Sequence, residues 1–221
     1  MTKSIEFVRN LDKIVILAQG PSWYQCPEEF PAGTEVWGSN VIYRDYLKSI
    51  DRLFFGHDIR HNMCHDDADI INNLNRMEIP VYTTGIFKVL KKGAQIPIEQ
   101  ILGEFHIAFF LNVICYMLAT AILQNPKSID MYGVDMRPDA GGETYTNEKG
   151  GVEFWCGVAI GRGITVNTTK ESYVMKTKQE GDFPGFKKKV EQAGLYLQIP
   201  LEQRNQFALQ NYAVMPIGDE I

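Results

Sequence analysis

The tetrapeptide Gln19, Gly20, Pro21 and Ser22 is the first place where residue types and spacing indicate chemistry. It directly follows the apolar run 13–18, which is rich in β-branched residues and predicts a buried strand. Gly20 permits close approach of the backbone to a ligand, Pro21 fixes the turn, and the Ser22 hydroxyl can donate a hydrogen bond or cap a helix. Because a helix N-terminus carries about half a positive charge, a phosphate is the expected ligand. An ordinary strand-to-helix turn is the alternative.

Polar residues also stand directly after the later strands that the sequence predicts, at Asn40, His57, Asp58 and Asp135. In a parallel sheet these residues share the carboxyl edge, where open α/β sheets bind their ligands. The Asn40 amide has both a donor and an acceptor for a base or ribose edge. Asp135 can hold a ribose hydroxyl or a metal, or cap the following loop. Each of these residues, taken singly, also suits a structural turn.

Three histidines, His57, His61 and His65, follow one another at intervals of four residues. On one continuous helix they would form a stripe able to bind a transition metal. His57 directly follows a predicted strand, however, so we favour a solvated polar segment and keep the metal site as the alternative.

The segment 135–163 is rich in glycine and predicts a mobile loop that closes over a ligand. Within it, Tyr145 can stack on a base or contact a phosphate. Glu153, expected near the start of a helix, is a candidate general base, and Asp135 is the other candidate catalytic carboxylate. A carboxylate that only stabilises the helix dipole is the alternative for Glu153. Trp155 is expected in the core.

The elements that must position these residues alternate between strand and helix. Such alternation predicts right-handed crossovers and a Rossmann-like α/β fold, a mostly parallel sheet flanked by helices. We expect a nucleotide-binding domain over 1–168, and over 169–221 a C-terminal arm that covers the same domain or contacts a partner subunit in a homo-oligomer. The strands are expected at 13–18, 35–38, 52–55, 80–83, 128–132 and 163–166, and the helices at 41–49, 66–77, 105–123 and 152–161.

Composition excludes several classes of protein. The 221 residues fit one domain, and 45% hydrophobic with 22% charged residues is an ordinary globular balance. A net charge of −5 argues against a broad nucleic-acid surface. The beginning of the chain lacks a secretory signal, and the longest apolar stretch, interrupted by Asn112 and Thr120, suits a core helix better than a membrane span. The four cysteines form no C-x-x-C pair, which favours free thiols and a cytoplasmic protein.

Taken in order, these motifs resemble a known family. The run 15–23 is similar to the G-x-G-P-S-L turn of the bacterial sialyltransferases of glycosyltransferase family 42 and of the related DUF115 proteins, which include archaeal 6-hydroxymethylpterin diphosphokinases and motility accessory factors. The run 37–40 resembles the end of their second strand, where an Asn contacts the CMP moiety. The run 114–136 resembles their long helix and the strand after it, which ends Gly-hydrophobic-Asp. The likeness extends over about 14–166.

The resemblance implies that the first turn lies against nucleotide phosphates and that Asn40 and Asp135 line the nucleotide pocket. A Tyr follows the Asp in the family, and Tyr145 is the candidate for it here. Two departures stand out. The family's Thr-Ser-Gly has no match around 104–106, and no His follows His106, although the sialyltransferases use a His as base in their C-terminal half. Glu153 or Asp135 would have to substitute.

Three functions follow from these expectations. The first is a nucleotide-dependent group transferase, most simply glycosyltransferase-like with a CMP-sugar or similar donor and an acceptor that the sequence does not identify. The second is an ATP-dependent diphosphokinase acting on a pterin-like alcohol, which needs Mg²⁺. The third is a non-catalytic nucleotide-binding module. Apart from Mg²⁺ in the second case, no cofactor is implied.

Overall fold

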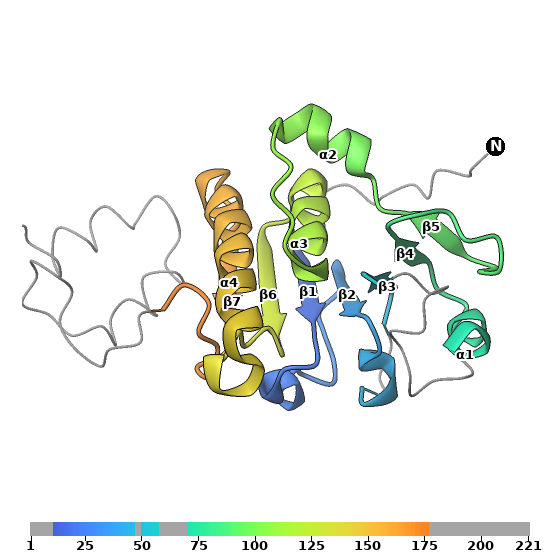
Figure 1. Cartoon of the computed structure of the whole chain (residues 1–221), viewed down its shortest axis with the longest axis horizontal. Helices are drawn as coiled ribbons and strands as arrows, with labels where there is room; N and C mark the ends of the chain where they lie inside the picture. Colours follow the sequence, from blue (N-terminus) through green and yellow to red (C-terminus); the bar gives the residue numbers. More distant parts are fainter. Residues whose placement is uncertain (1–10, 47–49, 58–69, 177–221) are drawn as a thin grey trace, which may run out of the picture.

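A seven-stranded, all-parallel sheet organises the chain, in the strand order β5-β4-β3-β2-β1-β6-β7 (Figure 1). The computed structural model describes residues 11–46, 50–57 and 70–176. It confirms the predicted Rossmann-like α/β class. The strands are β1 (Lys13–Leu17), β2 (Thr34–Ser39), β3 (Arg52–Phe55), β4 (Val81–Thr83), β5 (Gly93–Gln95), β6 (Ser128–Tyr132) and β7 (Thr165–Thr168). The α-helices are α1 (Ile70–Arg76), α2 (Ile98–Phe105), α3 (Val113–Gln124) and α4 (Pro138–Gly161), and the 3₁₀ helices are η1 (Pro21–Gln25) and η2 (Ile42–Arg44).

The direction in which the sheet grows reverses beside β1. The chain adds β2, β3, β4 and β5 in turn on one side of β1, then returns through α3 and adds β6 and β7 on the other side. The arrowheads of β1, β2 and β6 point to the same edge, at the bottom of Figure 1. The gap between the carboxyl ends of β1 and β6 is therefore the switch point at which such sheets bind ligands.

Two apolar cores cover the two faces of the sheet. Along β1, Ile14 and Ile16 face the core under α3 and α4, whereas Val15 and Leu17 face the core under η2 and α1. All four side chains are fully buried. This is why β1 is apolar without alternation, as expected for a central parallel strand covered on both faces.

The prediction of one long helix over 105–123 is wrong for the first part of that range. Helix α2 ends at Phe105, and His106 follows in the left-handed conformation (φ 54°). Helix α3 begins at Val113, because the side chain of Asn112 caps it by accepting a hydrogen bond from the Cys115 amide at 3.1 Å. Apolar residues run through both segments, and the sequence pattern does not show the break between them.

The mobile loop expected within 135–163 is also wrong, because helix α4 begins at Pro138 and runs for 24 residues. Its glycines are accommodated by tertiary packing. A Cβ atom on Gly151 would lie 3.0 Å from Cys115 Sγ and 3.0 Å from Leu111 Cγ, so the missing side chain allows α4 to approach α3 closely. Burial of an apolar stripe outweighs the low helix propensity of glycine here. Trp155, on this stripe, is fully buried as predicted.

Smaller differences concern the shorter elements. In place of the helix expected over 41–49, the structure has the 3₁₀ turn η2, with 47–49 outside the described residues. Of the helix expected over 66–77, the described part is α1. The edge strand β5 was not predicted, since it is only three residues long and lacks a buried apolar run. No helix in the described part of the chain is long and apolar enough to cross a membrane.

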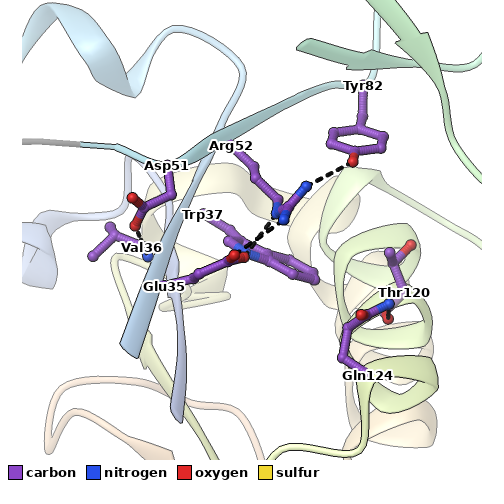
Figure 2. A network of polar contacts seen from close by, with 8 residues as sticks. All are labelled: Glu35, Val36, Trp37, Asp51, Arg52, Tyr82, Thr120 and Gln124. Atoms are coloured by element: carbon purple, nitrogen blue, oxygen red, sulfur yellow. Dashed lines mark hydrogen bonds and ion pairs between the residues drawn. The ribbon is translucent and has the colours of Figure 1, made fainter. Parts of the chain in front are cut away.

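A buried polar network ties β2, β3 and β4 together near their amino ends (Figure 2). The guanidinium of Arg52 donates to both carboxylate oxygens of Glu35, at 2.7 and 3.0 Å, and to the Tyr82 hydroxyl at 2.9 Å. The Trp37 indole donates to Glu35 at 2.7 Å. Bidentate geometry and several donors compensate the cost of burying these charges and fix the register of the three strands.

Candidate functional site

A cavity of about 810 Å³ lies at the carboxyl edge of the sheet, across the switch point between β1 and β6. Its floor consists of the loops that follow β1, β2, β3, β4 and β6, and its roof consists of the start of α3 and the first half of α4. Its volume falls in the range of small-molecule sites. The lining residues are Ala18, Gln19, Gly20, Pro21, Ser39, Asn40, Gly56, His57, Thr84, Phe110, Leu111, Asn112, Val113, Ile114, Tyr116, Gly133, Asp135, Met136, Arg137, Tyr145 and Glu148.

The turn after β1 lines this cavity, and most of its backbone amides already have partners. The Gly20 amide donates to the Gly133 carbonyl at 2.7 Å, and the Trp23 amide donates to the Gly20 carbonyl at 3.0 Å. The Ser22 amide donates to Asp135 Oδ2 at 2.7 Å, and Pro21 has no amide hydrogen. Helix η1 is a short 3₁₀ helix of five residues. Among Gln19, Gly20, Pro21 and Ser22, the amide of Gln19 is the one without a partner in the described part of the chain, so this turn offers a phosphate a single main-chain donor.

Ser22 and Asp135 form a buried clamp between the two sides of the switch point. The Ser22 hydroxyl donates to Asp135 Oδ1, and it accepts from the Gly133 amide and from the Thr169 hydroxyl, both at 3.0 Å. Ser22 and Asp135 are 1% and 3% exposed. Both carboxylate oxygens of Asp135 thus face donors of Ser22, so this pair joins the end of β1 to the end of β6.

Gly133 sits in the same clamp, with a positive φ of 68°. A Cβ atom there would lie 2.0 Å from the Ala18 carbonyl oxygen, closer than any side chain allows. The backbone geometry of the floor therefore requires glycine at position 133.

Asn40 and His57 lie together on the β2–β3 side of the cavity. Asn40 has φ 48°, and its Oδ1 accepts from the Gly56 amide at 3.0 Å. Within the described residues its Nδ2 group has no partner and remains available to a ligand. His57 is exposed at the end of β3, with its ring against Phe55. Asp58 lies outside the described residues.

The structure separates the two candidates on α4. Tyr145, 38% exposed, lines the cavity. Glu153 is in the interior of the helix, not at its start, and does not line the cavity. Its Oε1 accepts from Lys149 Nζ and from the Met175 amide.

The cavity is also lined by three residues that were not predicted from the sequence, Arg137, Glu148 and Asn112. Arg137, half-buried before the first turn of α4, is the one Lys or Arg that lines the cavity in the described part of the chain. Glu148 Oε2 accepts from Asn112 Nδ2 at 3.0 Å. The signal for Glu148 is its spacing: it continues the buried stripe of Val152, Trp155 and Ala159 toward the helix start, beyond the edge of the sheet. The glycines around Glu148 predict a loop, and a loop would not have this helical spacing.

Two titratable groups near the cavity are shifted mainly by burial. Burial lowers the pKa of Lys176, partly offset by the charges of Glu171 and Asp135. Burial also raises the pKa of Tyr116, so its hydroxyl is neutral at physiological pH. Nζ of Lys176 donates to the Thr169 carbonyl at 2.6 Å and so connects the two ends of the described segment after β7.

The metal alternative gains no support from the described residues. They contain no group of three or more His, Cys, Asp or Glu side chains placed to hold a metal ion. Of the three spaced histidines only His57 is described, whereas His61 and His65 lie outside the described residues.

Fold and cavity define the class: a Rossmann-like α/β protein with a ligand-sized cavity at its switch point. No protein-family model matches the chain, and no curated protein matches it either. Among solved structures, the chain is similar to the sialyltransferase CstII from Campylobacter jejuni in complex with the substrate analogue CMP-3FNeuAc, with 15% identity over 71% of this chain and 79% of that chain and a TM-score of 0.45. For the same enzyme in complex with cytidine-5'-monophosphate, the identity is 16%, the coverage 71% and 79%, and the TM-score 0.43. The resemblance is distant and shows no specific function.

Proposed function

We propose that the cavity binds a nucleotide-type ligand and that the protein is a nucleotide-dependent group transferase, most simply glycosyltransferase-like with a CMP-sugar or similar donor. The observation that carries this proposal is the position of the cavity at the switch point between β1 and β6. The motifs at 15–23, 37–40 and 114–136, which resemble those of family 42 sialyltransferases, support the choice of a CMP-type donor.

The contacts to the anionic part of the ligand come mainly from side chains in this proposal, because the amides of Gly20 and Ser22 have other partners. Arg137 is the natural contact for a phosphate, since a guanidinium binds two phosphate oxygens at once. Gln19 and the Nδ2 group of Asn40 are neutral donors on the floor, suited to the remaining oxygens or to the ribose and base.

The first experiment is a thermal-shift screen with CMP, CDP, UDP, GDP and ATP, each with and without Mg²⁺. A ligand that binds only the native state raises the melting temperature by mass action. We expect CMP to give a shift without Mg²⁺ and cytidine, which lacks the phosphate, to give a smaller one. Absence of any shift contradicts the proposal. A shift confined to ATP with Mg²⁺ favours the diphosphokinase instead.

The second experiment tests the anion contact with Arg137→Met. Loss of a charged hydrogen bond of about 1.5–3 kcal/mol weakens CMP binding roughly 10- to 150-fold. Arg162→Met is the matched control, because Arg162 caps the other end of α4, pairs with Glu104 and does not line the cavity. If Arg137→Met binds CMP as tightly as the control, the phosphate is held elsewhere.

A further inference from the structure

The cavity contains a carboxylate that neither the sequence motifs nor the proposed donor contacts use. This residue is Glu148, which is half-buried on α4, one turn after Tyr145, and lines the cavity. We propose that Glu148 is the catalytic general base that deprotonates the acceptor hydroxyl. This inference rests on the proposed function.

The two carboxylates expected for this role are placed for other purposes. Asp135 is 3% exposed, and both of its oxygens face donors of Ser22. Glu153 lies outside the cavity lining and holds the Met175 amide and Lys149. Glu148 and Asp135 are the only carboxylates that line the cavity in the described part of the chain. Glu148 is therefore the carboxylate there that can take up a proton without breaking the floor.

Asn112 holds Glu148 in a defined orientation. Asn112 Oδ1 must face the Cys115 amide, which can only donate, and this places Nδ2 toward the acceptor oxygen Oε2 of Glu148. The cap of α3 thereby fixes which way the Asn112 amide points. Within the described residues Oε1 of Glu148 has no hydrogen-bond partner, so this oxygen is available to accept a proton.

In the transfer step, Glu148 accepts the proton of the acceptor O–H group. The electron pair of that bond forms the new bond from the acceptor oxygen to the anomeric carbon of the donor. The bond between the anomeric carbon and the phosphate oxygen breaks, and its electron pair leaves on the phosphate of CMP. With water as acceptor, the same step releases free sugar and CMP, and Glu148 then returns the proton to solvent.

The charged and titratable groups around Glu148 come from several elements. Arg137 and His57 line the same cavity from the start of α4 and the end of β3. Tyr145 lies on the same helix. The pKa of the Cys115 thiol, on α3, is raised mainly by burial and also by the Glu148 charge. His57 is the other side chain among these that can accept a proton.

The test measures CMP release from CMP-N-acetylneuraminic acid with water as acceptor, alongside CMP binding by thermal shift. Glu148→Gln keeps an oxygen for Asn112 but removes the base. We expect CMP binding within about twofold of wild type and CMP release reduced at least about 100-fold. Glu104→Gln, on the exposed end of α2, is the matched control and keeps the wild-type rate.

A second variant distinguishes a base from a merely structural residue. Asn112→Asp keeps the helix cap, because Asp caps as well as Asn, but it places a second carboxylate beside Glu148. Two like charges in contact favour protonation, so the acid limb of the pH–rate profile should move up by about one pH unit. A structural residue would not move this limb.

The outcomes separate the two proposals. If wild type releases CMP and Glu148→Gln releases it equally fast, or if only His57→Gln loses the activity, the assignment of Glu148 is overturned and the proposed function stands. If wild type binds CMP but releases none from the donor, the protein is a binding module and the assignment falls. If wild type binds none of the five nucleotides, both proposals fall.

Discussion

Replacing Asp135 with Asn tests whether this residue is a clamp between β1 and β6 or a group that acts on the ligand. The Ser22 hydroxyl donates its one hydrogen to Asp135, and its two lone pairs are occupied by the Gly133 amide and the Thr169 hydroxyl. An Asn at 135 can accept from the Ser22 amide through its oxygen, but its NH₂ group then faces an oxygen with no free lone pair. The charge-assisted hydrogen bond from the Ser22 hydroxyl to residue 135 is lost, and this buried hydroxyl must donate to another acceptor.

The expected cost is about 3 kcal/mol, the upper end of the range for hydrogen bonds to charged groups. With a slope near 2 kcal/mol per molar urea, the unfolding midpoint falls by about 1.5 M. The fluorescence of Trp37 and Trp155, both fully buried, reports this transition. Asp12→Asn is the control, because Asp12 pairs with Lys127 at the surface and its loss changes stability by less than about 1 kcal/mol.

The refuting result is specific. If Asp135→Asn unfolds at the wild-type urea concentration but no longer binds CMP or releases it from the donor, Asp135 acts on the ligand and the clamp interpretation is wrong. A double-mutant cycle with Ser22→Ala provides the second check, since two residues in contact should show a coupling energy of about 1–3 kcal/mol.

Three further predictions concern stability. Glu35→Gln removes the carboxylate charge that pairs with the buried Arg52 and should cost about 3–5 kcal/mol in urea unfolding. Adding Arg52→Met should recover part of this loss, and strictly additive effects would contradict the pairing. Gln124 is 4% exposed, and its Oε1 has no hydrogen-bond partner in the described part of the chain. Gln124→Leu should therefore raise the free energy of unfolding by about 1 kcal/mol. A lowered urea midpoint would show that this oxygen has a hydrogen-bond partner. Burial raises the pKa of the Cys26 thiol from 9.0 to about 11. The unfolded chain therefore loses this proton at lower pH than the folded chain, and the free energy of unfolding should fall between pH 9 and 11. Cys26→Ala should flatten that part of the pH–stability curve, and an unchanged slope would contradict the prediction.

The sheet could be predicted from the sequence to a large extent. Buried parallel strands are short apolar runs that end in polar or glycine residues, and β1, β2, β3, β4 and β6 have this form. Strand β7 is less buried and lies at Thr165–Thr168, two residues later than expected. The order of the strands along the carboxyl edge also brought Gln19, Asn40, His57 and Asp135 into one cavity, as expected. The short edge strand β5 lacks this pattern and was not found.

The roof of the cavity could not be predicted, for reasons of tertiary packing. Glycine is a poor helix former, and only the close contact of Gly151 with Cys115 and Leu111 explains why α4 is continuous there. Asn112 is an ordinary polar residue in the sequence, and its role as a cap depends on where α3 begins. The partners of the turn amides are equally invisible, because Ser22 and Asp135 are separated by 113 positions in the chain.

The backbone contact between the two floor loops limits how this site can be changed by evolution or engineering. The Gly20 amide meets the Gly133 carbonyl, and neither glycine has room for a side chain. An insertion in either loop would separate the Gly20 amide from the Gly133 carbonyl. New ligand preferences are therefore easier to obtain by altering Asn40, Tyr145 or the segment before α3. Libraries that diversify those positions and leave both glycines untouched should contain the larger share of folded variants.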